Sequence, residues 1–170
     1  MRLTTRTNLA LRTLMFCAVN PDSLVRKQDA AIAVNGSENH LAQVINKLSQ
    51  EGFITTQRGR HGGFHLARDA SAISVGAVFR AFEQGLPFIE CNSSKNTCPL
   101  KAHCVMRSHL TRAVDAFYNA LDDVYLSELV ECNSGLEALL SLDAPRLSAQ
   151  CARSGAIADK PTCDTADALT

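Results

Sequence analysis

Two short helical segments joined by a tight turn constrain the fold of this chain more than any other feature of its sequence. The first, residues 25–35, is rich in alanine and ends at Asn35 and Gly36, which favour the left-handed conformation common at helix ends. Ser37 can cap the second, residues 38–51, through its side-chain oxygen. Two short helices in this order predict a helix-turn-helix. An apolar stripe marks the face of the second helix that turns toward the core: Leu41, Val44, Ile45 and Leu48.

A glycine-bearing hairpin follows the helix-turn-helix. The segments FITTQ at 53–57 and FHLA at 64–67 are strand-like, and the tip between them, RGRHGG, contains two arginines. A long charged tip of this kind is typical of a wing that reaches away from the body of the domain. Apolar spacing also predicts helices over residues 4–19 and 74–85. The sequence therefore predicts a mainly α-helical protein with a small β-wing, that is, a winged helix-turn-helix.

The chain from residue 100 to residue 130 contains no glycine or proline, which predicts one long helix. Its apolar residues alternate steps of four and three, the spacing of a helix that packs along another helix. Such a seam can pack on the chain's own body or on a second copy. We favour a dimerisation helix, because so small a domain covers only part of the stripe. The seam residues are Leu110, Val114, Phe117, Leu121 and Val124.

These patterns divide the chain into four expected regions. Residues 1–86 form the winged helix-turn-helix DNA-binding domain, and residues 87–105 form a loop that carries cysteines. Residues 106–142 contain the dimerisation helix and the segment after it. Residues 143–170 contain few large apolar side chains, and this composition predicts a disordered tail.

Composition and charge narrow the class of protein further. Hydrophobic residues make up 46% of the chain, enough for a sizeable core. Residues 1–68 contain nine Lys or Arg and four acids (+5), whereas residues 69–142 contain five and nine (−4). A basic first half indicates a polyanionic partner. The apolar stretches are too short and too often interrupted by charge for a membrane span or a secretory signal, so we expect a cytoplasmic protein.

The helix-turn-helix and the basic first half predict double-stranded DNA as the partner. The N-terminal part of a recognition helix meets base edges, where amides pair with adenine and carboxylates with cytosine. Basic residues of the N-terminus and the wing suit phosphates or the minor groove. In a dimer the two recognition helices lie about 34 to 36 Å apart and read a palindrome. The expected DNA-binding residues are Arg2, Ser37, Glu38, Asn39, His40, Gln43, Lys47, Arg58, Arg60 and His61, with Arg6 as a further phosphate contact.

Three cysteines, Cys91, Cys98 and Cys104, lie in a polar, turn-forming stretch, separated by six and five residues. Clustered thiols in a cytoplasmic protein indicate metal or redox chemistry more often than disulfides. Zinc sites usually contain close C-x2-C pairs, whereas this looser spacing suits an iron–sulfur cluster. The residues leave three possibilities open: an iron–sulfur cluster, zinc, and a thiol redox sensor. His103, beside Cys104, is a candidate additional ligand.

Four motifs together resemble the Rrf2 family of bacterial transcription regulators over about residues 1–142. They are MRLTTRTNLALRTL, SENHLAQVINKLSQEGFI, QRGRHGGFHLARDASAISVGAVFRAFE and the three cysteines before a long helix. The nitric-oxide-sensing repressors of the family are most similar in NHLAQVINKLSQEGFI and AISVGAVFRAFE, and the iron-responsive branch is similar in MRLTTRTN. The resemblance implies a homodimeric repressor with a 4Fe-4S or 2Fe-2S cluster on Cys91, Cys98 and Cys104, and nitric oxide as its effector.

The resemblance also bears on the fourth ligand of the cluster. In nitric-oxide sensors of the family, an aspartate in the first helix of the partner subunit supplies this ligand, and the matching residue here is Asn8. A neutral amide binds iron more weakly than a carboxylate, so His103, water or a small thiol are alternatives. Three alternative functions follow: iron sensing, general redox sensing through a cluster, and zinc- or thiol-dependent DNA binding without iron.

The sequence contains no pattern that suggests an enzyme. It shows no Ser/His/Asp array, no phosphate-binding glycine loop and no paired carboxylates. The glycines of RGRHGG lie in a hairpin and not between a strand and a helix, so they are not a dinucleotide-binding fingerprint. We therefore expect a non-catalytic regulator.

Overall fold

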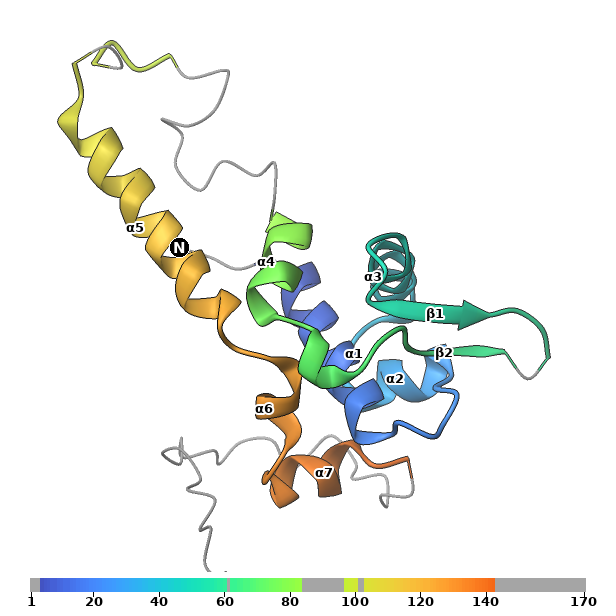
Figure 1. Cartoon of the computed structure of the whole chain (residues 1–170). Coiled ribbons are helices and arrows are strands. Elements are labelled where there is room, and N and C mark those ends of the chain that lie inside the picture. The colour runs from blue at the N-terminus through green and yellow to red at the C-terminus, as the bar shows by residue number, and fades with distance from the viewer. Residues whose placement is uncertain (1–3, 61, 84–96, 101–102, 143–170) are drawn as a thin grey trace, which may run out of the picture.

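The computed structural model describes residues 4–60, 62–83, 97–100 and 103–142. Figure 1 shows a helical body from which the β1–β2 hairpin and α5 project in different directions. The prediction of a mainly α-helical fold with a small β-wing is confirmed. In chain order the elements are α1 (Thr5–Val19), α2 (Lys27–Ala33), α3 (Glu38–Gln50), β1 (Ile54–Gln57), β2 (Gly63–Leu66), the 3-10 helix η1 (Ala70–Ala72), α4 (Val75–Glu83), α5 (Val105–Asp122), α6 (Leu126–Val130) and α7 (Ser134–Leu140).

Helix α1 supplies much of the core. It begins after Thr4, whose side-chain oxygen accepts a hydrogen bond from the Thr7 N–H at 3.3 Å. Helices α2, α3, α4, α6 and α7 and strand β2 all pack against it. Each large apolar side chain enclosed in this way contributes about 1.5–3 kcal/mol to folding. The largest fully enclosed side chains include Leu14, Phe16, Leu41, Leu48, Ile54 and Leu126.

The turn between α2 and α3 forms as the sequence predicts. Asn35 takes the left-handed conformation, with φ of 50°, and the Gly36 N–H donates to the Ala31 carbonyl at 2.9 Å. The Ser37 hydroxyl accepts from the His40 N–H at 3.3 Å, which caps α3. One face of α3 packs into the core through three buried side chains, and the opposite face is exposed. They are Leu41, Val44 and Leu48.

The wing is an antiparallel pair in which Ile54 lies opposite Leu66. Val25, just before α2, adds to its edge, because Val25 and Phe64 exchange two backbone hydrogen bonds of 2.9 Å. A Cβ at Gly63 would lie 2.5 Å from the Val25 carbonyl oxygen, so only glycine permits this approach. The wing is thereby attached to the helix-turn-helix.

The prediction of a single long helix over residues 100–130 is wrong, because the structure has two helices there, α5 and α6. The backbone between them pairs with the segment that precedes α4. The Val75 N–H donates to the Val124 carbonyl at 2.8 Å, and the Leu126 N–H donates to the Ile73 carbonyl at 2.9 Å. These bonds and the burial of Leu126 in the core favour a break over a continued helix.

The C-terminal half of α5 packs on α4, which lies between α5 and α1 (Figure 1). The rings of Phe117 and Phe79 meet edge to face, with centroids 5.9 Å apart. The Arg80 guanidinium lies 4.9 Å from the centroid of the Tyr118 ring and pairs with the Asp122 carboxylate. Helix α4 is therefore the support on which α5 is mounted.

Helices α6 and α7 fold back onto α1 and do not continue along α5. The Asn20 side chain joins the end of α7 to the end of α1, since its Nδ2–H donates to the Leu140 carbonyl and its Oδ1 accepts from the Leu142 N–H, both at 2.9 Å. The expected region 106–142 thus has two parts, α5 and a segment that completes the core. The tail predicted over 143–170 lies outside the described residues.

Candidate DNA interface and cysteine segment

Helix α3 presents exposed polar side chains along its N-terminal part, as the sequence predicts. Two of the expected DNA contacts are held by neighbours: the Glu38 carboxylate lies 3.2 Å from the Lys27 ammonium, and the Lys47 ammonium lies 2.6 Å from the Glu51 carboxylate. Lys47 is only half exposed. Surface pairs of this kind contribute little to stability, so DNA can displace them. The exposed residues of the N-terminal part are Ser37, Glu38, Asn39, His40 and Gln43.

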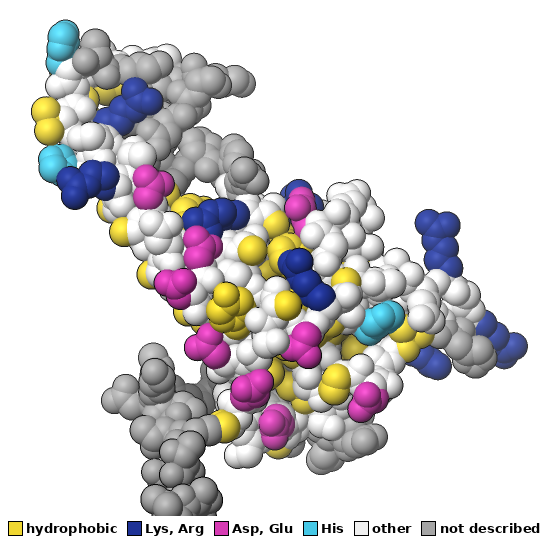
Figure 2. All heavy atoms as spheres, viewed as in Figure 1, with side chains coloured by type: hydrophobic (Ala, Val, Ile, Leu, Met, Phe, Trp, Pro, Cys, Tyr) yellow, Lys and Arg dark blue, Asp and Glu magenta, His cyan; other side chains and the backbone are white. Residues whose placement is uncertain are grey.

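The wing presents Arg58 and Arg60, both exposed. Gly59 between them has φ of 121°, a conformation that favours glycine and turns the tip. Figure 2 shows Lys and Arg side chains standing out at the wing, whereas Asp and Glu side chains gather over the middle and lower parts of the same view. Arg2 and His61, the other expected basic contacts, lie outside the described residues.

A groove of about 370 Å³ runs between α3 and the wing. Its polar lining includes Asn46, Ser49, Thr56 and Gln57, none of which the sequence singled out. Neutral side chains of this kind contact phosphate and sugar in protein–DNA complexes. Asn46 lies one helical turn after Gln43 on the exposed face of α3, so helical spacing was a signal that could have identified it. Thr56 and Gln57 carried no such signal, because they come from a strand that folding brings opposite α3.

Glu83, the last residue of α4, binds the first turn of α1. Its Oε1 accepts from the Thr4 N–H at 3.0 Å, from the Thr4 hydroxyl at 2.9 Å and from the Thr7 hydroxyl. Partial burial acts to raise the pKa of Glu83, but these hydrogen bonds outweigh it, and the pKa lies below its usual value of 4.5. No sequence pattern pointed to this contact, since Thr4 and Glu83 are 79 residues apart.

Arg6, in the same turn of α1, contacts the recognition helix. Its Nη2–H donates to Oε1 of Gln43 at 3.0 Å. The sequence placed Arg6 on DNA phosphates, whereas in the structure its hydrogen-bond partner is a residue expected to read bases. The first turn of α1 therefore contacts both the end of α4 and the exposed face of α3.

Two of the three clustered cysteines, Cys98 and Cys104, lie just before α5 and are half-buried. Cys104 is the N-cap residue of α5, and His103 beside it is exposed. Cys91 lies outside the described residues, and the part of the chain that the structure describes contains no group of three metal-binding side chains. By contrast, Cys17 is buried in the core, and this burial raises the pKa of its thiol to about 12, which disfavours the thiolate that binds a metal.

Helix α5 contains no buried residue, and every seam residue is half-buried. Phe117 packs on Phe79 of the same chain, so part of the seam is covered by the chain's own body. At the other end of α5, Val105 is 69% exposed and Met106 is 62% exposed. Among the described residues, those that cover this helix pack on its C-terminal part. The seam residues are Leu110, Val114, Phe117, Leu121 and Val124.

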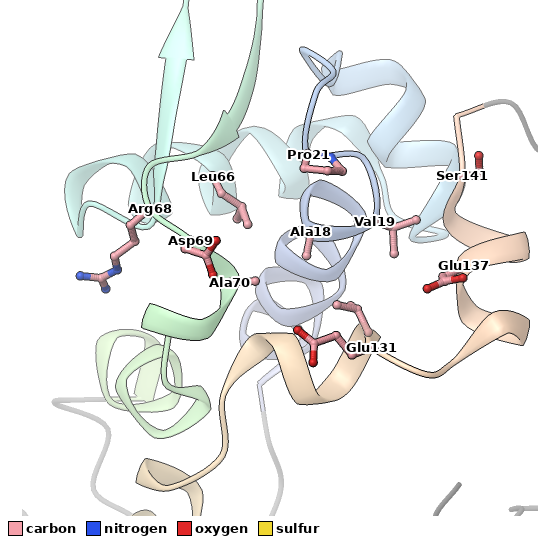
Figure 3. Close-up of a pocket in the computed structure, with 11 residues that line it drawn as sticks. Ala18, Val19, Pro21, Leu66, Arg68, Asp69, Ala70, Glu131, Glu137 and Ser141 are labelled. Atoms are coloured by element: carbon pink, nitrogen blue, oxygen red, sulfur yellow. The ribbon is translucent and has the colours of Figure 1, made fainter. Parts of the chain in front are cut away.

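A second hollow, of about 650 Å³, lies between the end of α1 and helices η1, α6 and α7 (Figure 3). Its acidic lining residues are Asp69, Glu131 and Glu137. Arg68 points away from the hollow, and its guanidinium lies 5.3 Å from the centroid of the Phe53 ring. Hydrogen bonds from the Ser71 hydroxyl and N–H lower the pKa of Asp69. Three carboxylates make this hollow less favourable for phosphates than the arginine-bearing wing.

An exposed polar recognition helix beside an arginine-bearing wing defines a winged helix-turn-helix DNA-binding protein. The chain belongs to the Rrf2 family: the family model described as "Iron-dependent Transcriptional regulator" matches residues 3–132. It is 38% identical over 142 residues to the HTH-type transcriptional regulator NsrR of Geobacillus kaustophilus, which covers 82% of this chain and 97% of that protein. It is 36% identical over 146 residues to protein aau3 of Rhizobium meliloti, covering 85% and 95%.

Solved structures of the same fold support the assignment. CymR of Staphylococcus aureus in its oxidized form aligns with a TM-score of 0.60 and 25% identity, over 77% of this chain and 97% of that one. IscR of T. potens aligns with a TM-score of 0.60 and 23% identity, over 77% and 87%. The protein is therefore a transcription regulator that binds DNA, and not an enzyme. Among the described helices none is long and apolar enough to cross a membrane.

Proposed function

We propose that this regulator is a cytoplasmic, homodimeric repressor that depends on an iron–sulfur cluster and is released from DNA by nitric oxide. The observation that carries the proposal is that α4 contacts both α1, which carries Arg6, and α5, which begins at the end of the cysteine segment, residues 87–105. Glu83 ends α4 just before the segment and holds the first turn of α1. Helix α5, which follows the segment, is mounted on α4 through Phe79 and Arg80. A change in the cysteine segment therefore acts on the helix that carries Arg6.

Cys91, Cys98 and Cys104 would hold the cluster as thiolates, and Asn8 or His103 would complete the ligand set. The two described cysteines suit this role, because half-buried thiols are shielded from bulk solvent and yet open to a small molecule. Asn8 and His103 are both exposed. When bound, the cluster supplies iron that reacts with nitric oxide. We propose a 4Fe-4S cluster, with a 2Fe-2S cluster as the alternative.

The chain's own residues transmit the change. Thr4 and Thr7 fix the first turn of α1 to Glu83, and Arg6 of that turn contacts Gln43 of α3. Displacing Glu83 releases this turn and alters the side chain that faces the bases. The switch needs only a small difference in binding free energy. A ligand that favours one dimer shape by about 5.5 kcal/mol moves a two-state equilibrium from 1:99 to 99:1.

A second copy of the chain would cover the exposed part of α5. Val105, Met106 and Leu110 lie beyond the part of this helix that packs on Phe79, and the first two are largely exposed. A dimer formed there brings two recognition helices to one palindromic operator, about 34 to 36 Å apart. Regulation then acts on the spacing of two DNA-reading elements as well as on each one.

Cofactor content tests the proposal. Protein purified without oxygen should contain iron and acid-labile sulfide in similar amounts, and Cys98→Ala should lose both while keeping its fold and dimer. Cys17→Ala is the matched control, because burial disfavours the thiolate of this residue and its loss should leave iron unchanged. A colourless wild-type protein with stoichiometric zinc contradicts the proposal and supports a zinc- or thiol-dependent regulator.

An iron-responsive regulator is the second candidate, favoured by the family description, which names iron dependence. The two functions differ in what removes the protein from DNA. Nitric oxide at constant iron should release the operator from a nitric-oxide sensor. An iron chelator without nitric oxide should release it from an iron sensor. Release by oxidants alone would instead indicate a general redox sensor that acts through the cluster.

A further inference from the structure

We infer that Arg6 is a positioning residue that determines which bases Gln43 can read. The inference rests on the DNA contact of α3 in the proposed function and does not depend on the cysteine segment. The Arg6 Nη2–H donates to Oε1 of Gln43 at 3.0 Å, and both side chains are exposed. The contact joins two residues of different helices that are 37 positions apart in sequence, so it is a product of the fold.

The core holds the two helices in the register that this contact needs. Leu9 and Ala10 of α1 and Leu41 and Val44 of α3 belong to one buried cluster. Helices α1 and α3 pack directly on each other. The backbone positions of Arg6 and Gln43 are therefore set by packing, and only the two side chains must be ordered to form the hydrogen bond.

The chemistry of the pair restricts Gln43. A glutamine that reads adenine uses both ends of its amide, because Oε1 accepts from the adenine amino group while Nε2–H donates to N7. A guanidinium has only donors, so the group of Gln43 that faces Arg6 must be its carbonyl. The amide NH2 then points away from Arg6. Arg6 takes one of the two lone pairs of Oε1, while both amide hydrogens stay free to donate, so we expect Gln43 to favour a base whose edge offers only acceptors, guanine or thymine.

Two substitutions separate this role from a plain phosphate contact. Arg6→Ala frees the Gln43 amide to turn, so adenine should become acceptable at the position that Gln43 reads. Gln43→Glu keeps the bond to Arg6 but replaces the donor with an acceptor, so preference should move to the bases with an amino group, adenine and cytosine. Loss of a phosphate contact instead weakens binding about equally for every sequence.

The test uses the full-length protein and operators selected by the wild type from random duplex DNA. Each position of the half-site is then changed to all four bases, and affinities are measured by fluorescence anisotropy at one salt concentration. Gln43→Ala identifies the position that Gln43 reads, since its preference should vanish there alone. At that position the wild type should favour guanine or thymine over adenine by about fivefold or more, and Arg6→Ala should reduce this ratio to about twofold or less.

Three outcomes overturn the inference: adenine preferred by the wild type at that position, no position sensitive to Gln43→Ala, or an Arg6→Ala variant weakened equally for all four bases. Arg112→Ala, which removes an exposed arginine from α5, is the control for lost charge and should leave every base preference unchanged. Circular dichroism establishes that each variant is folded. Operator binding that ignores the state of the cysteines would contradict the proposed switch but not this inference.

Discussion

Helices α3 and α5 differ in how completely their own chain covers them. Helix α3 has 13 residues, and Leu41, Val44 and Leu48 are buried against α1 and the wing. Helix α5 has 18 residues and no buried side chain. A single chain therefore completes the packing of the recognition helix, whereas α5 is only partly covered by the described residues.

This difference shows where regulation can act. A recognition helix must keep one shape to read bases, so its packing is finished within the chain. A sensor must have two arrangements of similar free energy, and elements that move in such transitions come from the less stable parts of a fold. In the proposed switch this element is α5, whose side-chain contacts with α4 through Phe117, Tyr118 and Asp122 lie near its C-terminal end.

The largest expected effect is on the buried core. Leu14 is fully enclosed in α1, so Leu14→Ala should lower the free energy of unfolding by about 2–5 kcal/mol. Leu110→Ala, on half-buried α5, is the matched control and should cost less than about 1.5 kcal/mol per chain at concentrations where the protein is a monomer. Urea denaturation followed by circular dichroism measures both values. Equal losses would remove the contrast between the core and α5.

Next in size is the effect of a charge on the seam of α5. Leu110→Asp places a carboxylate in the proposed dimer contact, which should weaken dimerisation about a hundredfold, since an unpaired buried charge costs several kcal/mol. Arg112→Asp introduces the same side chain on the opposite face of the helix and should leave the dimer intact. Analytical ultracentrifugation distinguishes the two. A Leu110→Asp protein that remains dimeric would place the interface elsewhere.

Gly76→Ala probes the contact between α4 and α5. A Cβ at this position would lie 2.7 Å from the backbone nitrogen and 2.9 Å from the Cα of Asp122, so α5 has to move away from α4. The cost should be about 1–3 kcal/mol, with loss of the Phe79–Phe117 contact. Gly135→Ala in α7 is the control, since its nearest neighbour would be 3.9 Å away. Thermal unfolding of both variants measures the difference.

The pH dependence of stability tests the contact between Glu83 and α1. The pKa of Glu83 is lowered in the folded protein, so the ionised carboxylate stabilises the fold above the unfolded value of about 4.5, and this contribution is lost as the pH falls through the lower folded value. The wild type should therefore be more stable than Glu83→Gln at neutral pH, and the difference should shrink below pH 4.5. A difference that stays constant down to pH 3 would show that Glu83 does not act through its charge.

The smallest expected effect concerns the wing. Arg60→Ala should weaken operator binding a few-fold and reduce the slope of log K against log salt by about 0.9, the value for one phosphate contact. The exposed Arg112 on α5 supplies the control, because its replacement by alanine should leave the slope unchanged. An unchanged slope for Arg60→Ala would show that this arginine does not contact a phosphate.

The sequence predicted the parts of the fold that local patterns encode. Asn35 and Ser37 marked the turn and the cap of α3, and the alternation of glycine and arginine marked the wing. The break between α5 and α6 escaped prediction, because it arises from backbone bonds between Val75 and Val124, which lie 49 positions apart. A stretch without glycine or proline is compatible with a continuous helix but does not require one.

The candidate site divides in the same way. The exposed face of α3 followed from helical spacing, whereas the contacts of Arg6 with Gln43 and of Thr4 with Glu83 join distant segments and carry no periodic signal. The sequence assigned Arg6 to a phosphate contact, because nothing in the sequence around an N-terminal arginine indicates another partner. Long-range hydrogen bonds of this kind become visible only once the packing of α1 is known.

Operator affinity as a function of cluster state tests the central claim most directly. Protein purified without oxygen is titrated with nitric oxide while cluster absorbance and DNA anisotropy are recorded in the same sample. We expect the two signals to fall together, with Cys98→Ala behaving from the start like the fully reacted protein. Operator binding that stays equally tight with the cluster intact, destroyed or never assembled would contradict the account.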